Sequence, residues 1–243
     1  HLIALSPGIA KGIQKRGIDP ESVTLIPNGC DLDIFDGSAK KWRPKGIKSS
    51  DILVLFAGTH GLANGLSSVL DAAGELKLRG RHDIKFLLVG DGKLKPSLVS
   101  RALNERLDNV LFHKPVNKIK LAGLMRATDL GLQVLTDIPA FYYGTSPNKF
   151  FDYISAGLPV LNNYPGWLSD MISEHNCGFC VPPQNASAFA DALEKAANDR
   201  SALTIKGVNA KRLAIENFDR NIQSSKWVDV VELSFKKHRK AKL

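Results

Sequence analysis

The chain has 243 residues, of which 44% are hydrophobic and 23% are charged. It is therefore long enough to bury one substantial core, and its composition excludes general disorder. The formal net charge at pH 7 is +9, and much of it lies in two runs of basic residues. These runs consist of Lys40, Lys41, Arg43, Lys45 and Lys48, and of Lys236, Lys237, Arg239, Lys240 and Lys242.

The basic runs have three interpretations. Runs of like charge are most often solvated loops or tails. The second interpretation is attraction to an anionic membrane surface, which is worth about 1 kcal/mol for each basic residue close to the lipid. Nucleic acid is a weaker third, because the runs contain no series of interleaved aromatic residues and no binding motif. We therefore expect no nucleic-acid partner.

The three cysteines argue for a reducing compartment, because an odd number in a chain of this size does not suit a disulfide framework. Cys177 and Cys180 do not open a helix and have no matching zinc ligands, so we expect two buried structural thiols. No stretch approaches the roughly 20 apolar residues of a membrane span, and no signal peptide is present. Because the chain begins with His1, we expect a piece of a longer protein.

Short apolar runs without alternation recur along the chain, as in strands that are buried on both faces of a parallel sheet. Strands are predicted at Val23–Ile26, Ile52–Ala57, Ile84–Val89, Val110–Phe112, Leu130–Leu135, Pro159–Leu161 and Phe179–Val181. Helices are predicted between them and after them, at Gly65–Leu78, Lys93–Leu107, Asn117–Ala127, Pro147–Ala156, Trp167–His175, Ala186–Asn198, Ser201–Asn217 and Asn221–Lys237. This alternation indicates βαβ units.

The sequence thus predicts an α/β fold, a Rossmann-like doubly wound parallel sheet with closing C-terminal helices. We place this sheet domain at residues 37–220 and a last helix with a basic tail at residues 221–243. Residues 1–36 do not fit the unit cleanly. In them, His1–Ser6 resembles a strand that leaves an earlier domain, and Pro7–Arg16 resembles a short helix.

In open α/β sheets, ligands bind beyond the carboxyl ends of the strands, so the loops that follow the strands are candidate sites. One loop contains Gly58, Gly61 and Gly65, whose backbone would let a phosphate approach closely, although a tight turn is an equally good interpretation. Of the six histidines, only His60 lies in a candidate site. The loop Gly90–Gly92 is a weaker signal, because such a sequence is most often a turn.

Another candidate loop opens the helix predicted at Pro147–Ala156. Ser146 is a favourable N-cap, and Pro147 suits the first helical position. Gly157 suits the cap at the other end of the helix. Together these residues fix where the helix should begin and end.

The start of this helix is a candidate anion site. The free N–H groups of Asn148 and Lys149 would point out of the helix, where an anion is favoured. A cation in the first turn opposes the helix dipole, so a bound diphosphate would explain Lys149. A surface pair between Lys149 and Asp152, three residues apart on one face, is the alternative.

Seven segments occur in a fixed order: IPNGCDLDIF (Ile26–Phe35), FAG-x5-NG (Phe56–Gly65), FLLVGDG (Phe86–Gly92), NVLFHKPV (Asn109–Val116), ATDLGL (Ala127–Leu132), SPNKFFDYISAGLPVL (Ser146–Leu161) and GFCVPP (Gly178–Pro183). In this order they resemble the C-terminal donor-binding domain of the family 4, or group 1, glycosyltransferases, which have the GT-B fold. The combination of SPNKFFDY with LNNYPGW (Leu161–Trp167) is most similar to the branch that assembles bacterial surface polysaccharides such as O-antigen, in which a fucosamine-type transferase acts on lipid-linked acceptors.

The resemblance implies a role for each matching position. Asp152 falls where the family binds the ribose hydroxyls. The donor diphosphate would be held by Gly61, Asn64, Ser146, Asn148 and Lys149. The base would lie against Gly90, Asp91, Lys114 and Val116, and the donor sugar against His60, Gly144 and Thr145.

Three positions depart from the family pattern. The Glu that contacts the donor sugar corresponds to Gly144. The Arg and Lys of the family's glycine loop correspond to Thr59 and Asn64. These departures leave Lys149 as the main cation for the diphosphate.

The resemblance implies a hexosyl or N-acetylhexosaminyl transferase that moves a sugar from a UDP-sugar or GDP-sugar to a lipid-linked saccharide with retention. Its acceptor site and catalytic residues would lie in an N-terminal domain of which residues 1–36 are the remnant. We expect no cofactor and no metal, and a cytoplasmic protein that is peripheral on the inner membrane face. The alternatives are a UDP-sugar epimerase of the same fold and a non-catalytic nucleotide-sugar-binding or scaffold module.

Overall fold

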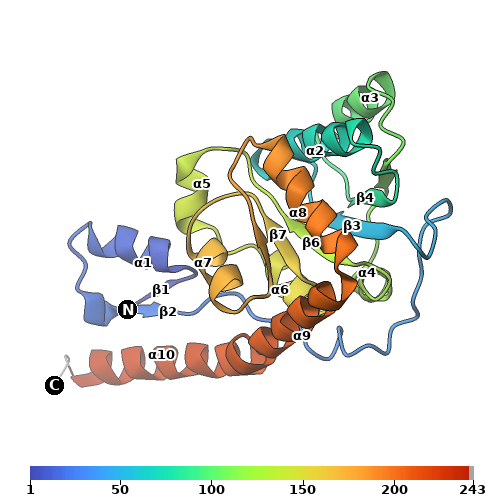
Figure 1. Cartoon of the computed structure of the whole chain (residues 1–243). Coiled ribbons are helices and arrows are strands. Elements are labelled where there is room, and N and C mark those ends of the chain that lie inside the picture. Colours follow the sequence, from blue (N-terminus) through green and yellow to red (C-terminus); the bar gives the residue numbers. More distant parts are fainter. Residues whose placement is uncertain (241–243) are drawn as a thin grey trace.

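The computed structural model describes residues 1–240, with side chains as far as residue 236. Its centre is a six-stranded parallel sheet with the strand order β5-β4-β3-β6-β7-β8 (Figure 1). The chain winds outward in opposite directions from β3 and β6, so a topological switch point lies between these two strands. The strands are β1 Leu2–Ala4, β2 Val23–Leu25, β3 Ile52–Ala57, β4 Ile84–Val89, β5 Val110–His113, β6 Leu130–Gln133, β7 Val160–Asn162 and β8 Gly178–Cys180.

Helices cover both faces of this sheet. All six residues of β3 are buried, and because successive side chains point to opposite faces, β3 contributes to two cores. Ile52, Val54 and Phe56 face α2, α3 and α8, whereas Leu53 and Leu55 face α4, α6, α7 and α9. The helices are α1 Pro7–Gln14, α2 Ser67–Leu78, α3 Lys95–Asn104, α4 Lys118–Met125, α5 Pro139–Gly144, α6 Asn148–Ser155, α7 Trp167–Glu174, α8 Ala186–Asn198, α9 Arg200–Asn217 and α10 Arg220–Lys240.

The predicted doubly wound α/β fold is confirmed. Each predicted strand is present within two residues of its predicted bounds. Helix α5 was not predicted, because six residues are too few to show a helical periodicity. The prediction of two buried thiols is correct for Cys177 and wrong for Cys180, which lies exposed at the end of the edge strand β8.

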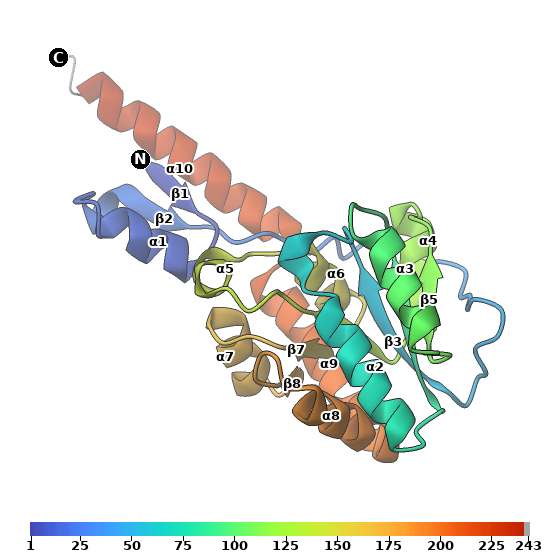
Figure 2. The same cartoon turned by 90° about the horizontal axis from the view of Figure 1, so that it is seen from above.

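Strands β1 and β2, helix α1 and helix α10 lie on one side of the sheet domain (Figures 1 and 2). Strands β1 and β2 pair with each other in parallel and form a separate two-stranded sheet. Helix α10 extends from the sheet domain along this small unit (Figure 2). Lys236 forms an ion pair with Glu232 at 3.4 Å, while the rest of the predicted basic tail lies outside the described side chains. No helix within the described residues combines the length and apolar character that crossing a bilayer requires.

Tyr153 fixes helix α6 onto the end of β3. Its hydroxyl accepts a hydrogen bond from the Ala57 amide at 2.9 Å and donates to the Leu55 carbonyl at 3.3 Å. Its ring lies over Gly131 in β6, where an added Cβ would come within 2.6 Å of it. The small residue in β6 therefore lets α6 approach the sheet closely at the switch point.

We predict that Gly131→Ala destabilises the protein by about 1–3 kcal/mol, because the methyl group overpacks against the fully buried Tyr153 ring. Urea unfolding measures this free energy. Gly74→Ala in α2 is the matched control, since its added Cβ would meet nothing closer than 3.9 Å. It should be neutral or stabilising in a helix interior. Equal stability of the Gly131→Ala variant and the unaltered chain would contradict the packing described for Tyr153.

Candidate functional site

A cavity of about 360 Å³ lies at the carboxyl ends of β3, β4 and β5, where ligands bind in open α/β sheets. Three of the residues predicted to hold the base line it, as do the first two residues of the glycine loop that follows β3. Lys114, the fourth of the predicted base residues, is exposed and does not line it. The lining residues are Ala57, Gly58, Thr59, Val89, Gly90, Asp91, Pro115, Val116 and Leu121.

Two loops form the floor of this cavity by packing against each other. Gly90 has φ +149°, and an added Cβ would lie 1.9 Å from the Gly58 carbonyl oxygen. At this position glycine is needed both for the backbone conformation and for the close approach. The loop Gly90–Gly92, which the sequence indicated only weakly, therefore makes the contact that shapes the cavity.

Helix α6 starts beside the cavity, one residue later than predicted. Pro147 occupies the N-cap with φ −81° and ψ 129°, and Asn148 is the first helical residue. The prediction of Ser146 as the N-cap is wrong. Its carbonyl accepts a hydrogen bond from Asn28 at 2.7 Å, and its buried hydroxyl has no partner within the described residues. The N–H groups at the start of a helix have no partner within the helix, so the first turn of α6 is still a candidate anion site.

Lys149 lies in this first turn as a partly buried cation. Its Nζ donates a hydrogen bond to the Asn64 side chain and lies 4.3 Å from the centre of the Phe56 ring. No carboxylate pairs with it among the side chains that the structure describes. Burial lowers the pKa of Lys149 to about 8, because desolvation disfavours the charged form. The site therefore contains a partly desolvated cation without a counter-charge.

Asp152 lies one turn further along α6 and pairs with a different residue. Its carboxylate accepts from Lys118 at 3.1 Å, so the alternative of a Lys149–Asp152 surface pair is wrong. Burial raises the pKa of Asp152, and Lys118 partly opposes that effect. Asp31 joins the network by pairing with both Lys118 and Arg220.

The residues predicted to hold the donor sugar are not brought together as one surface. His60 is fully buried between Phe56 and Phe112, with ring centroids at 6.0 and 6.1 Å. Burial lowers its pKa, and its ring nitrogens have no hydrogen-bond partner within the described residues. The structure therefore does not bring the His60 imidazole to the crevice, whereas Gly144 and Thr145 lie at the end of α5, near the start of α6.

The glycine loop that follows β3 also lies next to the start of α6, since Asn64 in this loop accepts a hydrogen bond from Lys149. Asn64 donates to the Thr59 carbonyl at 2.8 Å, which closes the loop upon itself. Gly61 precedes the short 3₁₀ turn Leu62–Asn64 in this loop. Asn64, Lys149 and the first turn of α6 thus adjoin one another, as the diphosphate prediction requires.

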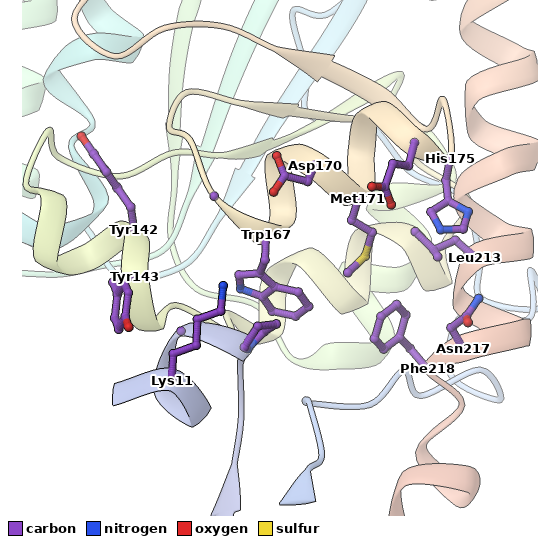
Figure 3. A pocket seen from close by; sticks show the side chains of 14 residues that line it. Lys11, Tyr142, Tyr143, Trp167, Asp170, Met171, His175, Leu213, Asn217 and Phe218 are labelled. Atoms are coloured by element: carbon purple, nitrogen blue, oxygen red, sulfur yellow. The ribbon is translucent and has the colours of Figure 1, made fainter. Parts of the chain in front are cut away.

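A second cavity, of about 550 Å³, was not predicted (Figure 3). Trp167 lies at its centre in Figure 3, and the Trp167 indole donates to the Thr145 carbonyl at 2.6 Å. Lys11 from α1, Tyr143 from α5 and Phe218 at the end of α9 also line it. Since these residues are far apart in the sequence, no local motif indicates the cavity. Among the described residues, no group of three or more His, Cys, Asp or Glu side chains could hold a metal ion.

Residues 38–213 match the model of the family described as glycosyl transferases group 1. The chain belongs to this family. Its structural neighbours are GT-B glycosyltransferases, and the sheet domain has their fold.

Curated relatives show the same family. The chain is 28% identical over 211 residues to a D-inositol 3-phosphate glycosyltransferase of Paenarthrobacter aurescens, covering 82% of this chain and 49% of that protein. It is 28% identical over 206 residues to the lipopolysaccharide glucosyltransferase WaaG of Escherichia coli, covering 81% and 52%. The chain thus spans about half the length of these relatives. They are not specifically fucosamine-type transferases.

Solved structures show the same fold. The WaaG crystal structure has a TM-score of 0.73 at 22% identity, covering 92% of this chain and 60% of that one. The structure of Anabaena Alr3699/HepE in complex with UDP and glucose has a TM-score of 0.76 at 18% identity, covering 95% and 62%. At these identities the comparison concerns the fold alone.

We predict that Lys149 titrates near pH 8, as followed by NMR of isotope-labelled lysine side chains. Asn64→Asp should raise the pKa of Lys149, because a carboxylate within a few ångströms stabilises the charged ammonium group. A Lys149 resonance that titrates with the exposed lysines would show that the cation is not desolvated.

Proposed function

We propose that this chain is the donor-binding half of a glycosyltransferase that uses a UDP-sugar. The observation that carries the proposal is Lys149, a partly buried and desolvated cation at the start of α6 that has no carboxylate partner among the described side chains. A desolvated cation is normally paired, so an exception at a helix N-terminus favours a bound anion. The diphosphate of a nucleotide sugar would supply the missing counter-charge.

The proposed nucleotide follows the carboxyl edge of the sheet from β5 to β6. The base occupies the cavity of about 360 Å³ against Gly90, Asp91 and Val116. The ribose hydroxyls bind Asp152, which shares its carboxylate with Lys118. The diphosphate lies on Lys149 and the α6 amides beside Asn64, and the sugar extends toward Gly144 and Thr145. The HepE structure with UDP supports a uridine nucleotide by analogy of fold.

In the proposed reaction, the bond between the anomeric carbon and the β-phosphate oxygen breaks while an acceptor hydroxyl attacks that carbon, with retention of configuration. The hydroxyl proton passes to the leaving diphosphate. Negative charge grows on the leaving diphosphate. Lys149 and the amides of α6 are already oriented toward that charge, and groups fixed in this way contribute several kcal/mol in a site that excludes water. No metal is required for this stabilisation.

The acceptor and the groups that act on it are proposed to belong to a further domain. A two-stranded sheet is marginal alone, and β1 and β2 leave Leu2 and Leu25 more than 40% exposed. On α10, Trp227 and Val231 are 50% and 54% exposed. These surfaces favour a domain that extends the small sheet and covers α10. A lipid-linked saccharide acceptor, and hence a peripheral place on the inner membrane, is the corresponding proposal for the whole protein.

A non-catalytic nucleotide-sugar-binding module is the second candidate, favoured by Gly144. This residue has no side chain for the donor sugar, and an added Cβ would lie 3.4 Å from Ile9. A sugar-nucleotide epimerase of the same fold remains a further alternative. Products separate these functions, since an epimerase changes the sugar while it remains a nucleotide sugar.

We predict that UDP binds without added metal and that a chelator leaves its affinity unchanged. Lys149→Met should weaken binding by about 1.5–3 kcal/mol, the range for hydrogen bonds to charged groups. Affinity should fall above about pH 8, because the unliganded protein then loses the Lys149 proton that the diphosphate requires. Calorimetry measures all three effects, with Lys93→Met as the exposed control. Strict dependence on magnesium would contradict this site.

We predict that Asp152→Asn weakens UDP binding by about 1.5–3 kcal/mol, because the amide accepts the ribose hydroxyls less strongly than the carboxylate. Asp170→Asn, which changes an exposed carboxylate in the other cavity, is the control and should bind normally. If UDP affinity is unchanged while the melting temperature of Asp152→Asn falls steeply, Asp152 has only a structural role beside Lys118.

We predict that the chain alone transfers no sugar, and that joining it to the proposed acceptor-binding domain gives turnover. Product analysis with labelled UDP-sugars measures transfer. Transfer by the chain alone would contradict the assignment of the acceptor groups to another domain. UDP-sugar binding without turnover in the complete protein would support the non-catalytic module.

A further inference from the structure

Two segments of the sheet domain contain basic residues and no acidic ones. The first is residues 37–50, the loop that leads into β3, and the second is residues 109–128, which include β5 and α4. The first contains five Lys or Arg residues and the second contains four. They are separated by more than fifty residues, so the sequence does not indicate that they meet.

The fold places the two segments side by side. The Trp42 amide donates to the Gly123 carbonyl at 3.3 Å, and its indole donates to the Lys120 carbonyl at 2.7 Å. Arg126 donates to the Ala39 carbonyl, also at 2.7 Å. An added Cβ at Gly123 would come within 2.2 Å of the Lys40 carbonyl oxygen, so the loop lies directly on α4. Figure 2 shows this loop along the side of the domain that includes α4.

Most cations of these segments have no counter-charge. Arg43 pairs with Asp129, and Lys118 pairs with Asp31 and Asp152. The others are exposed and form no ion pair with a described carboxylate. In the loop they are Lys40, Lys41, Lys45 and Lys48. On the second segment they are Lys114, Lys120 and Arg126. We call these seven residues, with Ile119 and Trp42, the basic face.

The basic face also presents apolar side chains. Ile119 on α4 is 61% exposed, and the half-buried Trp42 ring lies against the Lys120 ammonium group at 5.1 Å. A cationic surface with an exposed aliphatic residue matches a lipid surface, where the charges meet anionic headgroups and the apolar side chain enters the interface. A single-stranded nucleic acid would instead need several aromatic platforms, and this face has one ring that is already covered by Lys120.

We propose that the basic face docks on a membrane surface that is rich in anionic lipid. This inference rests on the proposed peripheral place of the protein at a membrane and names the surface that would make the contact. Its test is separate from that of the nucleotide site, because none of the free cations that it invokes belongs to the Lys149 or Asp152 contacts. The exposed Trp227 and Val231 of α10 and the β1–β2 sheet do not belong to the basic face, so they are available to a further domain.

The test compares two triple variants of the whole chain. Lys41, Lys45 and Lys48 are replaced by Gln in the first, and Lys93, Lys195 and Lys226 are replaced by Gln in the control, so both lose the same charge. Sedimentation uses vesicles of phosphatidylglycerol with phosphatidylcholine, and vesicles of phosphatidylcholine alone. At about 1 kcal/mol for each basic residue at the surface, the first variant should bind anionic vesicles roughly a hundredfold more weakly. The control should bind like the unaltered chain.

Two further measurements test the apolar and the electrostatic contributions to vesicle binding separately. Ile119→Ser should also weaken vesicle binding, whereas UDP affinity should be the same in all these variants. Binding should weaken at high salt, because the Debye length falls from about 10 Å at 0.1 M to about 3 Å at 1 M ionic strength. Equal loss in both triple variants, equal binding to neutral vesicles, or retention by a DNA duplex without binding to anionic vesicles would each overturn the proposal.

Discussion

The position of helix α6 on the sheet determines the rest of the site, and the Tyr153 hydroxyl fixes that position. Because this hydroxyl bonds the last residues of β3, α6 begins above the point where the strand order reverses. Gly131 makes room for the ring. One packing contact therefore places the helix amides, Lys149 and Asp152 together at the carboxyl edge of the sheet. Without it, the same residues would not face the loops after β3 and β4.

The two charged residues of α6 have opposite electrostatic environments. Asp152 has a cationic partner in Lys118, while Lys149 has only an amide oxygen and an aromatic face. Leaving a desolvated cation without a carboxylate costs stability, which is expressed in the lowered pKa of Lys149. A protein that evolved for stability alone would place a carboxylate at Asn64. The neutral amide there keeps the ammonium group available to an anionic ligand.

The strands of the sheet could be predicted from the sequence because they are continuous apolar runs. Such runs arise where both faces of a strand are buried. The sequence predicted the place of the crevice because parallel strands end at one edge. The start of α6 was displaced by one residue, because the extended ψ of Pro147 makes it the N-cap rather than the first helical residue. The burial of His60 between two phenylalanines depends on β5, which no local pattern connects to the β3 loop. For the same reason the cavity around Trp167 and the meeting of the two basic segments were not predicted.

A crystal structure of the chain with UDP would test the role of Lys149 most directly. A β-phosphate oxygen should lie within about 2.7–2.9 Å of the Lys149 Nζ, the distance of a charge-assisted hydrogen bond. The uracil should lie in the cavity between Gly90 and Val116, with Asp152 on the ribose. UDP bound in the cavity around Trp167, or a diphosphate that leaves Lys149 bonded to Asn64 alone, would contradict the proposed site.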